Sequence, residues 1–262
     1  MILAAAFVGV LAVLAVVALM LMNKGNSGSD SQGPGPGDGS SSNVTGKLLK
    51  TLLESVDVDV RAGTGAGKQH ALNKKFAGSP FPMRDAAVAA FDIRFAPGYE
   101  WGCQGKIGGL SVGPGESSGG RYSRNGASHR LMWDDGGGAF AYVYIPEGTE
   151  GRQPSQLGKN AAYGQGVWKS DFRNAFTTGK WHHVELGVKL NSMNGSTPNA
   201  DGKLMLSIDG KTRVLGGVIW RQIPNLAIEE FGLGIFHGGP CSASKNSSLS
   251  IKNLAIHEWK GR

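Results

Sequence analysis

The chain has 262 residues, 42 of them glycine, and a formal net charge of +7 at pH 7. Residues 1–46 hold one lysine and two aspartates, so the rest of the chain carries a net charge of +8. A basic domain favours polyanionic partners, and the sequence contains no long Lys/Arg run or nucleic-acid motif. These features argue against nucleic acid and favour an acidic polysaccharide or an anionic surface; a solvated basic surface without a partner is the alternative.

The first predicted element is an apolar segment at residues 1–22, which contains no charged side chain. About 20 apolar residues suffice for a helix to span a bilayer. A cleavable signal peptide usually has a basic start and a shorter apolar stretch. We therefore expect one N-terminal transmembrane helix that anchors a single-pass protein, with its C-terminal domain on the non-cytoplasmic side. A signal peptide is the alternative.

The next segment, residues 23–46, consists largely of Gly, Ser, Pro, Asp and Asn. This composition buries too little apolar surface to offset the entropy of ordering, so we predict a flexible linker. The remaining residues, 47–262, have an ordinary size for one β-sandwich.

Periodicity within residues 47–262 predicts an all-β domain that begins with a short helix. Apolar residues at 47–56 have helical spacing, whereas residues 56–60 alternate Val and Asp as in a strand. Clusters of glycine at 105–120 and 232–239 suggest loops that let a ligand approach the backbone. Short strands with regular turn residues predict a β-jelly roll, or two-sheet antiparallel sandwich. The predicted strands are 87–95, 127–133, 139–145, 181–190, 203–208, 231–236 and 249–259.

Two cysteines and two adjacent histidines leave structural alternatives open. Cys103 and Cys241 either form one disulfide, which would suit an extracytoplasmic location, or remain as buried thiols. His182 and His183 fit a polar sheet face better than a catalytic role. The sequence contains no HExxH, paired CxxC or calcium-loop motif, so neither a metal nor another cofactor is predicted.

Four polar side chains are predicted to share one face of one sheet. Side chains two apart on a strand point the same way, which pairs Ser128 with Arg130 and Tyr142 with Tyr144. A hairpin loop of odd length, such as residues 135–137, would place Arg130 opposite Tyr142. A cation, a hydroxyl and two phenols on one face suggest a site for a polyanionic sugar.

The same region carries a family resemblance. A Gly-Lys-x-x-Gly-Leu segment at residues 105–110 precedes the Ser-x-Arg strand at 128–130 and the Tyr-x-Tyr strand at 142–144. This order resembles polysaccharide lyase family 14, the alginate and glucuronan lyases known from chlorella viruses and molluscs. The resemblance covers about residues 80–262, and it implies five catalytic residues: Lys106, Ser128, Arg130, Tyr142 and Tyr144. Lys106, His129 and Arg130 are assigned to substrate binding.

The sequence departs from the family pattern at three places. Gly108 stands where a proline is usual, Gln104 replaces the first of two glycines before the lysine, and His237 replaces a phenylalanine. All five implied catalytic positions are kept. We therefore expect these departures to affect substrate preference more than the reaction.

The resemblance implies a lyase that cleaves a polyuronate by β-elimination. Such an enzyme must neutralise the carboxylate at C5, remove the C5 proton and protonate the oxygen that leaves C4. Arg130 and Lys106 would neutralise the carboxylate, and Tyr142 and Tyr144, with pKa values lowered by the cations, would transfer protons. Ser128 would hold the substrate or orient a tyrosine.

These observations favour a membrane-anchored lyase of glucuronan or alginate that acts on algal cell walls, in a virus or in an organism that remodels such walls. The alternative is a non-catalytic carbohydrate-binding or virion protein that keeps the lyase fold. A tethered chain lends weight to that alternative, because degradative enzymes are often released.

Overall fold

The computed structural model describes residues 45–63, 70–75, 85–158 and 162–260, with the backbone alone for 70–75. These residues belong to one compact unit. None of the helices in this described part is long and apolar enough to cross a bilayer. The predicted anchor at residues 1–22 and almost all of the predicted linker lie outside the described residues.

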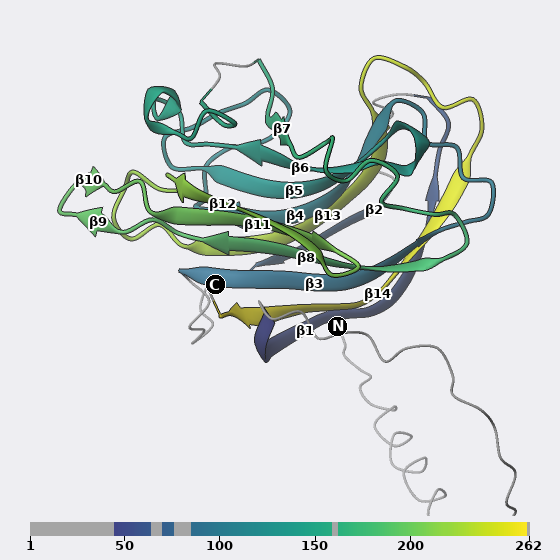
Figure 1. Cartoon of the computed structure of the whole chain (residues 1–262), viewed down its shortest axis with the longest axis horizontal. Helices are drawn as coiled ribbons and strands as arrows, with labels where there is room; N and C mark the ends of the chain where they lie inside the picture. Colours follow the sequence, from purple (N-terminus) through teal and green to yellow (C-terminus); the bar gives the residue numbers. More distant parts are fainter. Residues whose placement is uncertain (1–44, 64–69, 76–84, 159–161, 261–262) are drawn as a thin grey trace, which may run out of the picture. The chain divides into compact units, whose positions relative to one another are not determined.

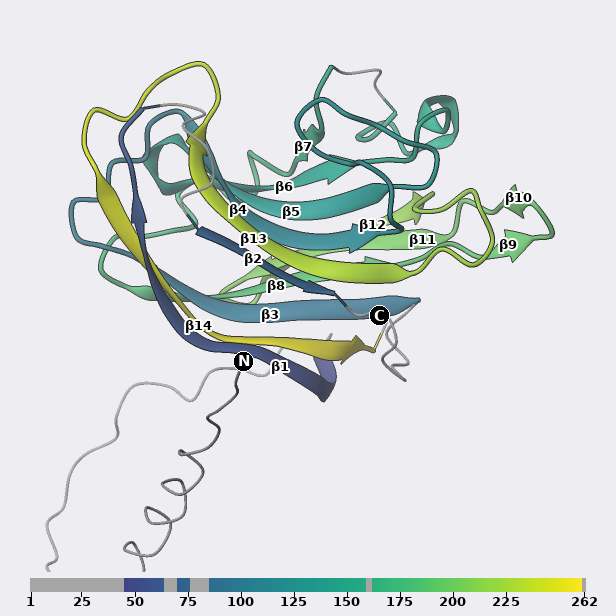
Figure 2. The same ribbon diagram turned by 180° about the vertical axis from the view of Figure 1, so that it is seen from behind.

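Two six-stranded antiparallel sheets stack face to face, as Figure 1 and Figure 2 show from opposite sides. The all-β, two-sheet prediction is therefore confirmed. The first sheet has the order β1 (Thr45–Val60), β14 (Ser247–Trp259), β3 (Ala86–Phe95), β8 (Trp181–Lys189), β11 (Gly202–Ile208) and β12 (Lys211–Val218). The second sheet has the order β2 (His70–Lys75), β13 (Ile228–Gly238), β4 (Gln104–Val112), β5 (Ala127–Asp134), β6 (Ala139–Tyr144) and β7 (Gln165–Val167). The short strands β9 (Met193–Asn194) and β10 (Thr197–Pro198) form a separate hairpin.

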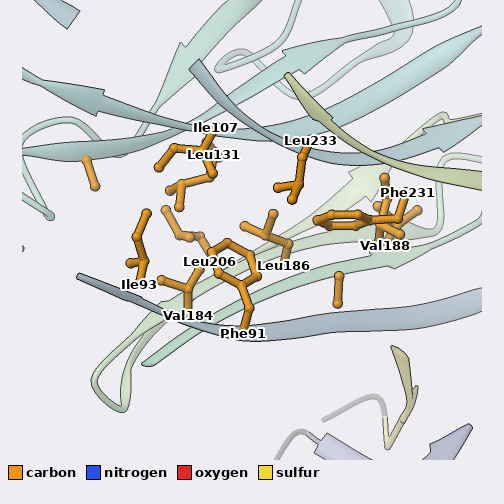
Figure 3. Close-up of a cluster of buried hydrophobic side chains, with 14 of the residues drawn as sticks. Phe91, Ile93, Ile107, Leu131, Val184, Leu186, Val188, Leu206, Phe231 and Leu233 are labelled. Carbon is orange, nitrogen blue, oxygen red and sulfur yellow. The ribbon is translucent and has the colours of Figure 1, made fainter. Parts of the chain in front are cut away.

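The core lies between the two sheets, where alternate residues of each strand interdigitate. Phe91 of β3 and Leu186 of β8 face Leu131 of β5 and Phe231 of β13, and all four side chains are fully buried (Figure 3). Full burial of such a side chain contributes about 1.5–3 kcal/mol. Because these residues alternate with polar ones, each strand presents its other side chains to an outer face.

The helix predicted for residues 47–56 is wrong, because those residues belong to the long strand β1. This strand pairs with β14 from the Thr45–Trp259 pair to the Val60–Ser247 pair, with three register shifts between Thr45 and Leu53. Shifts of this kind interrupt the strict alternation of a strand, so the leucines acquire a spacing that resembles a helix. A ten-residue helix is marginal by itself, whereas β14 offers a continuous partner.

The loops predicted for the two glycine clusters are largely strands. β4 includes Gly105 and Gly109, and β13 extends to Gly238. A Cβ atom at Gly105 would lie 1.8 Å from the ring of Trp133, and one at Gly109 would lie 2.0 Å from the His129 carbonyl oxygen. These glycines therefore allow β4 and β5 to pack closely.

The two cysteines form a disulfide that joins the start of β4 to the segment between β13 and β14. The Cα atoms of Cys103 and Cys241 are 5.5 Å apart, and 138 positions separate them in sequence. This pairing resolves the alternative that the sequence left open.

Candidate active site

The hairpin of β5 and β6 brings the four predicted polar residues together. Arg130 is opposite Tyr142, and Ser128 is opposite Tyr144, as predicted. The register follows from a three-residue 3-10 turn, Asp135–Gly137, which is closed by a hydrogen bond of 2.7 Å from the Asp134 N–H to the Gly138 carbonyl oxygen.

Lys106 reaches the same outer face from β4. It is paired with Met132 of β5 and with Phe236 of β13, and Met132 shares a face with Arg130 by strand alternation. The Lys106 Nζ atom is 5.4 Å from the ring centroid of Tyr142 and 5.4 Å from that of Phe236. All five predicted catalytic side chains therefore gather on the outer face of the second sheet.

Glycines surround the pair at the centre of this face. Gly232, Gly109, Arg130, Tyr142 and Gly166 form one row across β13, β4, β5, β6 and β7. Gly109 and Gly166, the neighbours of Arg130 and Tyr142 in this row, have no side chains. The surface beside the pair is therefore formed by the backbone. A flat polymer can lie across such a surface.

The loop between β4 and β5, residues 113–126, is attached to the site through its own main chain. The Ser117 carbonyl oxygen accepts hydrogen bonds from Arg130 Nη1 at 2.5 Å and from Ser128 Oγ at 2.9 Å. Arg130 Nη1 also donates to Ser128 Oγ at 2.5 Å. On the other side of the site, the Gly120 N–H donates to the Tyr144 hydroxyl at 2.9 Å.

Burial divides the five residues into two groups. Ser128 and Tyr144 are both 0% exposed, whereas Lys106, Arg130 and Tyr142 are partly exposed. Two further loop contacts enclose the Tyr144 phenol. Its ring centroid is 4.9 Å from that of Tyr122, and the Tyr122 hydroxyl donates to the Tyr163 carbonyl oxygen at 2.5 Å. A ligand on this face therefore meets Lys106, Arg130 and Tyr142, while Ser128 and Tyr144 support them from beneath.

The pKa of Tyr142 is shifted in the opposite direction from the one predicted. Burial, followed by a hydrogen bond with Tyr144 at 3.5 Å, raises the pKa of Tyr142. Burial likewise raises the pKa of Tyr122 to about 12. The sequence predicts that nearby cations lower the pKa of Tyr142; the structure shows the opposite direction, because desolvation of its phenol dominates. At neutral pH the Tyr142 phenol is protonated and suited to donate a proton.

Burial also lowers the pKa of Arg130, an effect that Tyr144, Tyr142 and Glu230 oppose. The guanidinium group keeps its charge under all ordinary conditions. Because Nη1 is already committed to Ser117 and Ser128, the guanidinium is held in one orientation. Its other nitrogen atoms are the ones suited to a carboxylate on this face.

Comparison with known protein families gives a match over most of the chain. The family model of polysaccharide lyase 14 matches residues 53–250. The chain belongs to the polysaccharide lyase 14 family. It is 26% identical over 243 residues to exolysin of Paramecium bursaria Chlorella virus 1, an alignment that covers 83% of this chain and 36% of exolysin. The chain thus spans about a third of the length of that relative.

Solved structures of two relatives share the fold. The alginate lyase vAL-1 from a Chlorella virus superimposes with a TM-score of 0.70 at 27% identity, over 83% of this chain and 91% of that one. The PL-14 alginate lyase of Aplysia kurodai gives a TM-score of 0.63 at 22% identity, over 78% and 82% of the two chains. At that lower identity the second likeness supports the fold alone.

The position of His129 does not support its assignment to substrate binding in this polysaccharide lyase 14 chain. His129 is 0% exposed and points into the core, against the backbone of Gly187. Burial lowers its pKa to about 3. Strand alternation explains the position, because a residue between Ser128 and Arg130 must face the opposite way.

The adjacent histidines His182 and His183 make structural contacts on the first sheet. His183 lies on the outer face, half exposed, with Nδ1 2.8 Å from Asp92 Oδ1, as predicted. His182 is buried instead, with Nδ1 2.7 Å from Asp209 Oδ2. The prediction of a polar sheet face therefore holds for His183 and fails for His182, which points inward beside Phe176.

Sequence reasoning missed the contribution of the loop at residues 113–126. Ser117 and Gly120 act through main-chain atoms, which every residue type carries, so their identity gave no signal. Tyr122 could have been noticed as an aromatic residue in a glycine- and serine-rich loop. The positions of Phe236 and Met132 beside Lys106 were also missed, because apolar residues usually belong to the core.

Proposed function

We propose that the chain is a polysaccharide lyase that cleaves an acidic polyuronate of the alginate or glucuronan type by β-elimination. The observation that carries this proposal is the oriented guanidinium of Arg130, tied to Ser117 and Ser128 and placed opposite the protonated phenol of Tyr142. A fixed cation beside a proton donor is what elimination next to a carboxylate requires. The alginate lyase vAL-1 has the same fold and supports this substrate class.

We assign the steps of the reaction to the three partly exposed residues. Arg130 binds the uronate carboxylate and stabilises the charge that develops when C5 loses its proton. We assign Lys106 the part of the base, in place of the carboxylate-neutralising role expected from the sequence: once Nζ has given a proton to solvent, it accepts the C5 proton, and the electron pair of the C5–H bond forms the C4–C5 double bond. The C4–O bond breaks, and Tyr142 donates its hydroxyl proton to the leaving oxygen. Proton transfer from the ammonium to the phenolate restores both groups.

Ser128 and Tyr144 position the residues that react. The Ser128 hydroxyl holds Arg130, and the Tyr144 hydroxyl lies 3.5 Å from the Tyr142 hydroxyl. Because both side chains are buried, neither touches a sugar in this arrangement of the loop.

The test is the release of unsaturated uronates, which absorb in the ultraviolet, from alginate and glucuronan. We expect Tyr142→Phe to lower kcat by at least about a hundredfold, because a general acid contributes that much. Tyr144→Phe should have a smaller effect. Tyr163→Phe is a matched control, since Tyr163 is 62% exposed and contacts Tyr122 only through its carbonyl group.

Full activity of Tyr142→Phe would refute the assignment of Tyr142 as the proton donor. A wild-type protein that binds either polymer and releases no unsaturated product would instead be a non-catalytic polysaccharide-binding protein, which is the second reading of the sequence.

We infer further that residues 1–22 anchor this lyase in a membrane, with the β-sandwich on the non-cytoplasmic side, either in a host cell or on a virus particle. The support is the charge-free apolar composition of the segment and the disulfide of the domain. We expect the full chain to stay in the membrane fraction after alkaline carbonate extraction and to keep an N-terminal tag. Loss of the tag with release of the domain would identify a signal peptide.

A further inference from the structure

We propose that the outer face of the first sheet carries a second polysaccharide-binding site, formed by Trp181, Arg94 and Lys252, which takes a uronate chain. The choice of a polyuronate rests on the proposed function. The site itself rests on an exposed aromatic ring with two cations beside it.

The three residues come from neighbouring strands. Trp181 begins β8 and is paired with Arg94 of β3, while Lys252 lies on β14, the next strand of the sheet. The Arg94 Cζ atom is 4.7 Å from the centroid of the Trp181 ring, and the Lys252 Nζ atom is 4.3 Å from it. Trp181 remains 37% exposed, so the cations do not enclose the ring.

This site lies on the opposite side of the molecule from the catalytic residues. The next residue, His182, points into the core, so Trp181 points outward. Arg130 and Tyr142 occupy the outer face of the other sheet, and the core separates the two faces (Figure 1 and Figure 2). A single stretch of sugar that fills the catalytic groove therefore cannot reach Trp181.

The charges around Trp181 favour an anionic ligand. Asp92, beside Lys252, is bonded to His183 at 2.8 Å and to Asn253 at 2.7 Å. His183 is a cation at neutral pH because Asp92 raises its pKa to about 9, and its charge offsets that of Asp92. Asp57 faces Ser250 on the edge strand, one strand away from Arg94. Arg94 and Lys252 thus place two positive charges 4.7 and 4.3 Å from the centroid of the ring.

Each part of the site matches one part of a uronate chain. The apolar face of a pyranose ring can stack on the indole, and carboxylates can pair with Arg94 and Lys252. A neutral glucan can stack on the indole but has no carboxylate to pair with Arg94 and Lys252. Two sites on opposite faces would hold the enzyme on a polymer network more firmly than the groove alone.

Retention in native gels that contain alginate, glucuronan or neutral dextran tests this site. The experiment uses the Tyr142→Phe protein, so the polymer survives. We expect Trp181→Ala, and the double change Arg94→Gln/Lys252→Gln, to weaken retention by each polyuronate about fivefold. Trp181→Phe should restore much of it. Val214→Ala is the matched control, because Val214 is 42% exposed on β12 of the same sheet and has no cation at its side chain among the described contacts.

The Arg130→Gln variant distinguishes polymer binding at the catalytic face from binding at the second site. Because the two sites do not touch, the losses caused by Arg130→Gln and Trp181→Ala should add in the combined variant. Unchanged retention of a folded Trp181→Ala protein, or an equal loss in dextran, would overturn the proposal. Retention that depends on Trp181 in a wild-type chain without lyase activity would uphold the second site and reject the proposed reaction.

Discussion

Tyr142 and Tyr144 lie two residues apart on one strand, and their surroundings give them different tasks. Tyr144 is enclosed by Gly120 and Tyr122, whereas Tyr142 is half exposed beside Lys106. The sequence predicts proton transfer by both phenols. Burial separates them into a proton donor and its support, since a group that transfers a proton must reach the substrate.

At the same scale, His129 should make the protein sensitive to acid. Its pKa is about 3 in the fold and 6.5 when exposed, so the buried ring is neutral. Its contribution to stability is complete above pH 6.5 and is lost as the pH falls from 6.5 toward 3, by up to about 1.4 kcal/mol per pH unit. We expect His129→Leu to flatten this slope in urea unfolding between pH 6.5 and pH 4.

His183→Gln provides the opposite control for this measurement. The pKa of His183 is raised to about 9, chiefly by its hydrogen bond to Asp92, so its contribution is complete below pH 6.5 and is lost as the pH rises through 9. If His129→Leu and the wild type lose stability in parallel as the pH falls, His129 is not the group that titrates.

At the scale of elements, the close packing of β4 against β5 predicts that a side chain at Gly109 destabilises the fold. A Cβ atom at Gly109 would lie 2.0 Å from the His129 carbonyl oxygen, so Gly109→Ala must push β4 away from β5. We expect the free energy of unfolding to fall by about 3 kcal/mol or more. Thermal or urea unfolding measures this loss.

Gly151→Ala is the matched control, because a Cβ atom at Gly151 meets nothing within 4 Å. Its effect should stay within about 0.5 kcal/mol. An equally small effect of Gly109→Ala would show that β4 and β5 can separate without loss, contrary to the packing described.

Local patterns predicted part of these elements and missed others for identifiable reasons. Strands such as β5, β6 and β8 alternate cleanly, and the odd hairpin loop sets the register of Arg130 opposite Tyr142. The strand predicted for residues 56–60 is confirmed as the end of β1, whereas the first part of β1 and all of β4 were missed because their form depends on distant partners: β14 in one case, and the ring of Trp133 in the other. The burial of Tyr144 depends on the fold of the loop at residues 113–126, which no short pattern encodes.

At the scale of the whole molecule, the sandwich turns two chemically different faces outward. The second sheet presents Arg130 and Tyr142 beside glycines, and the first sheet presents the exposed ring of Trp181 next to two cations. The core that separates them is built from apolar residues alternating with these polar ones. Family membership was visible in the spacing of Lys106, Ser128, Arg130, Tyr142 and Tyr144, whereas the Trp181 surface could be recognised only from the register of three strands.

The disulfide between Cys103 and Cys241 encloses every one of the catalytic residues within a single covalent ring of the chain. A ring of this length stabilises a fold by about 5 kcal/mol in the chain-entropy view, and it closes only in oxidising compartments. A newly made chain in a reducing cytosol therefore lacks this restraint. Full stability therefore depends on closure of this disulfide, so the redox state of the surroundings controls how strongly the fold is restrained.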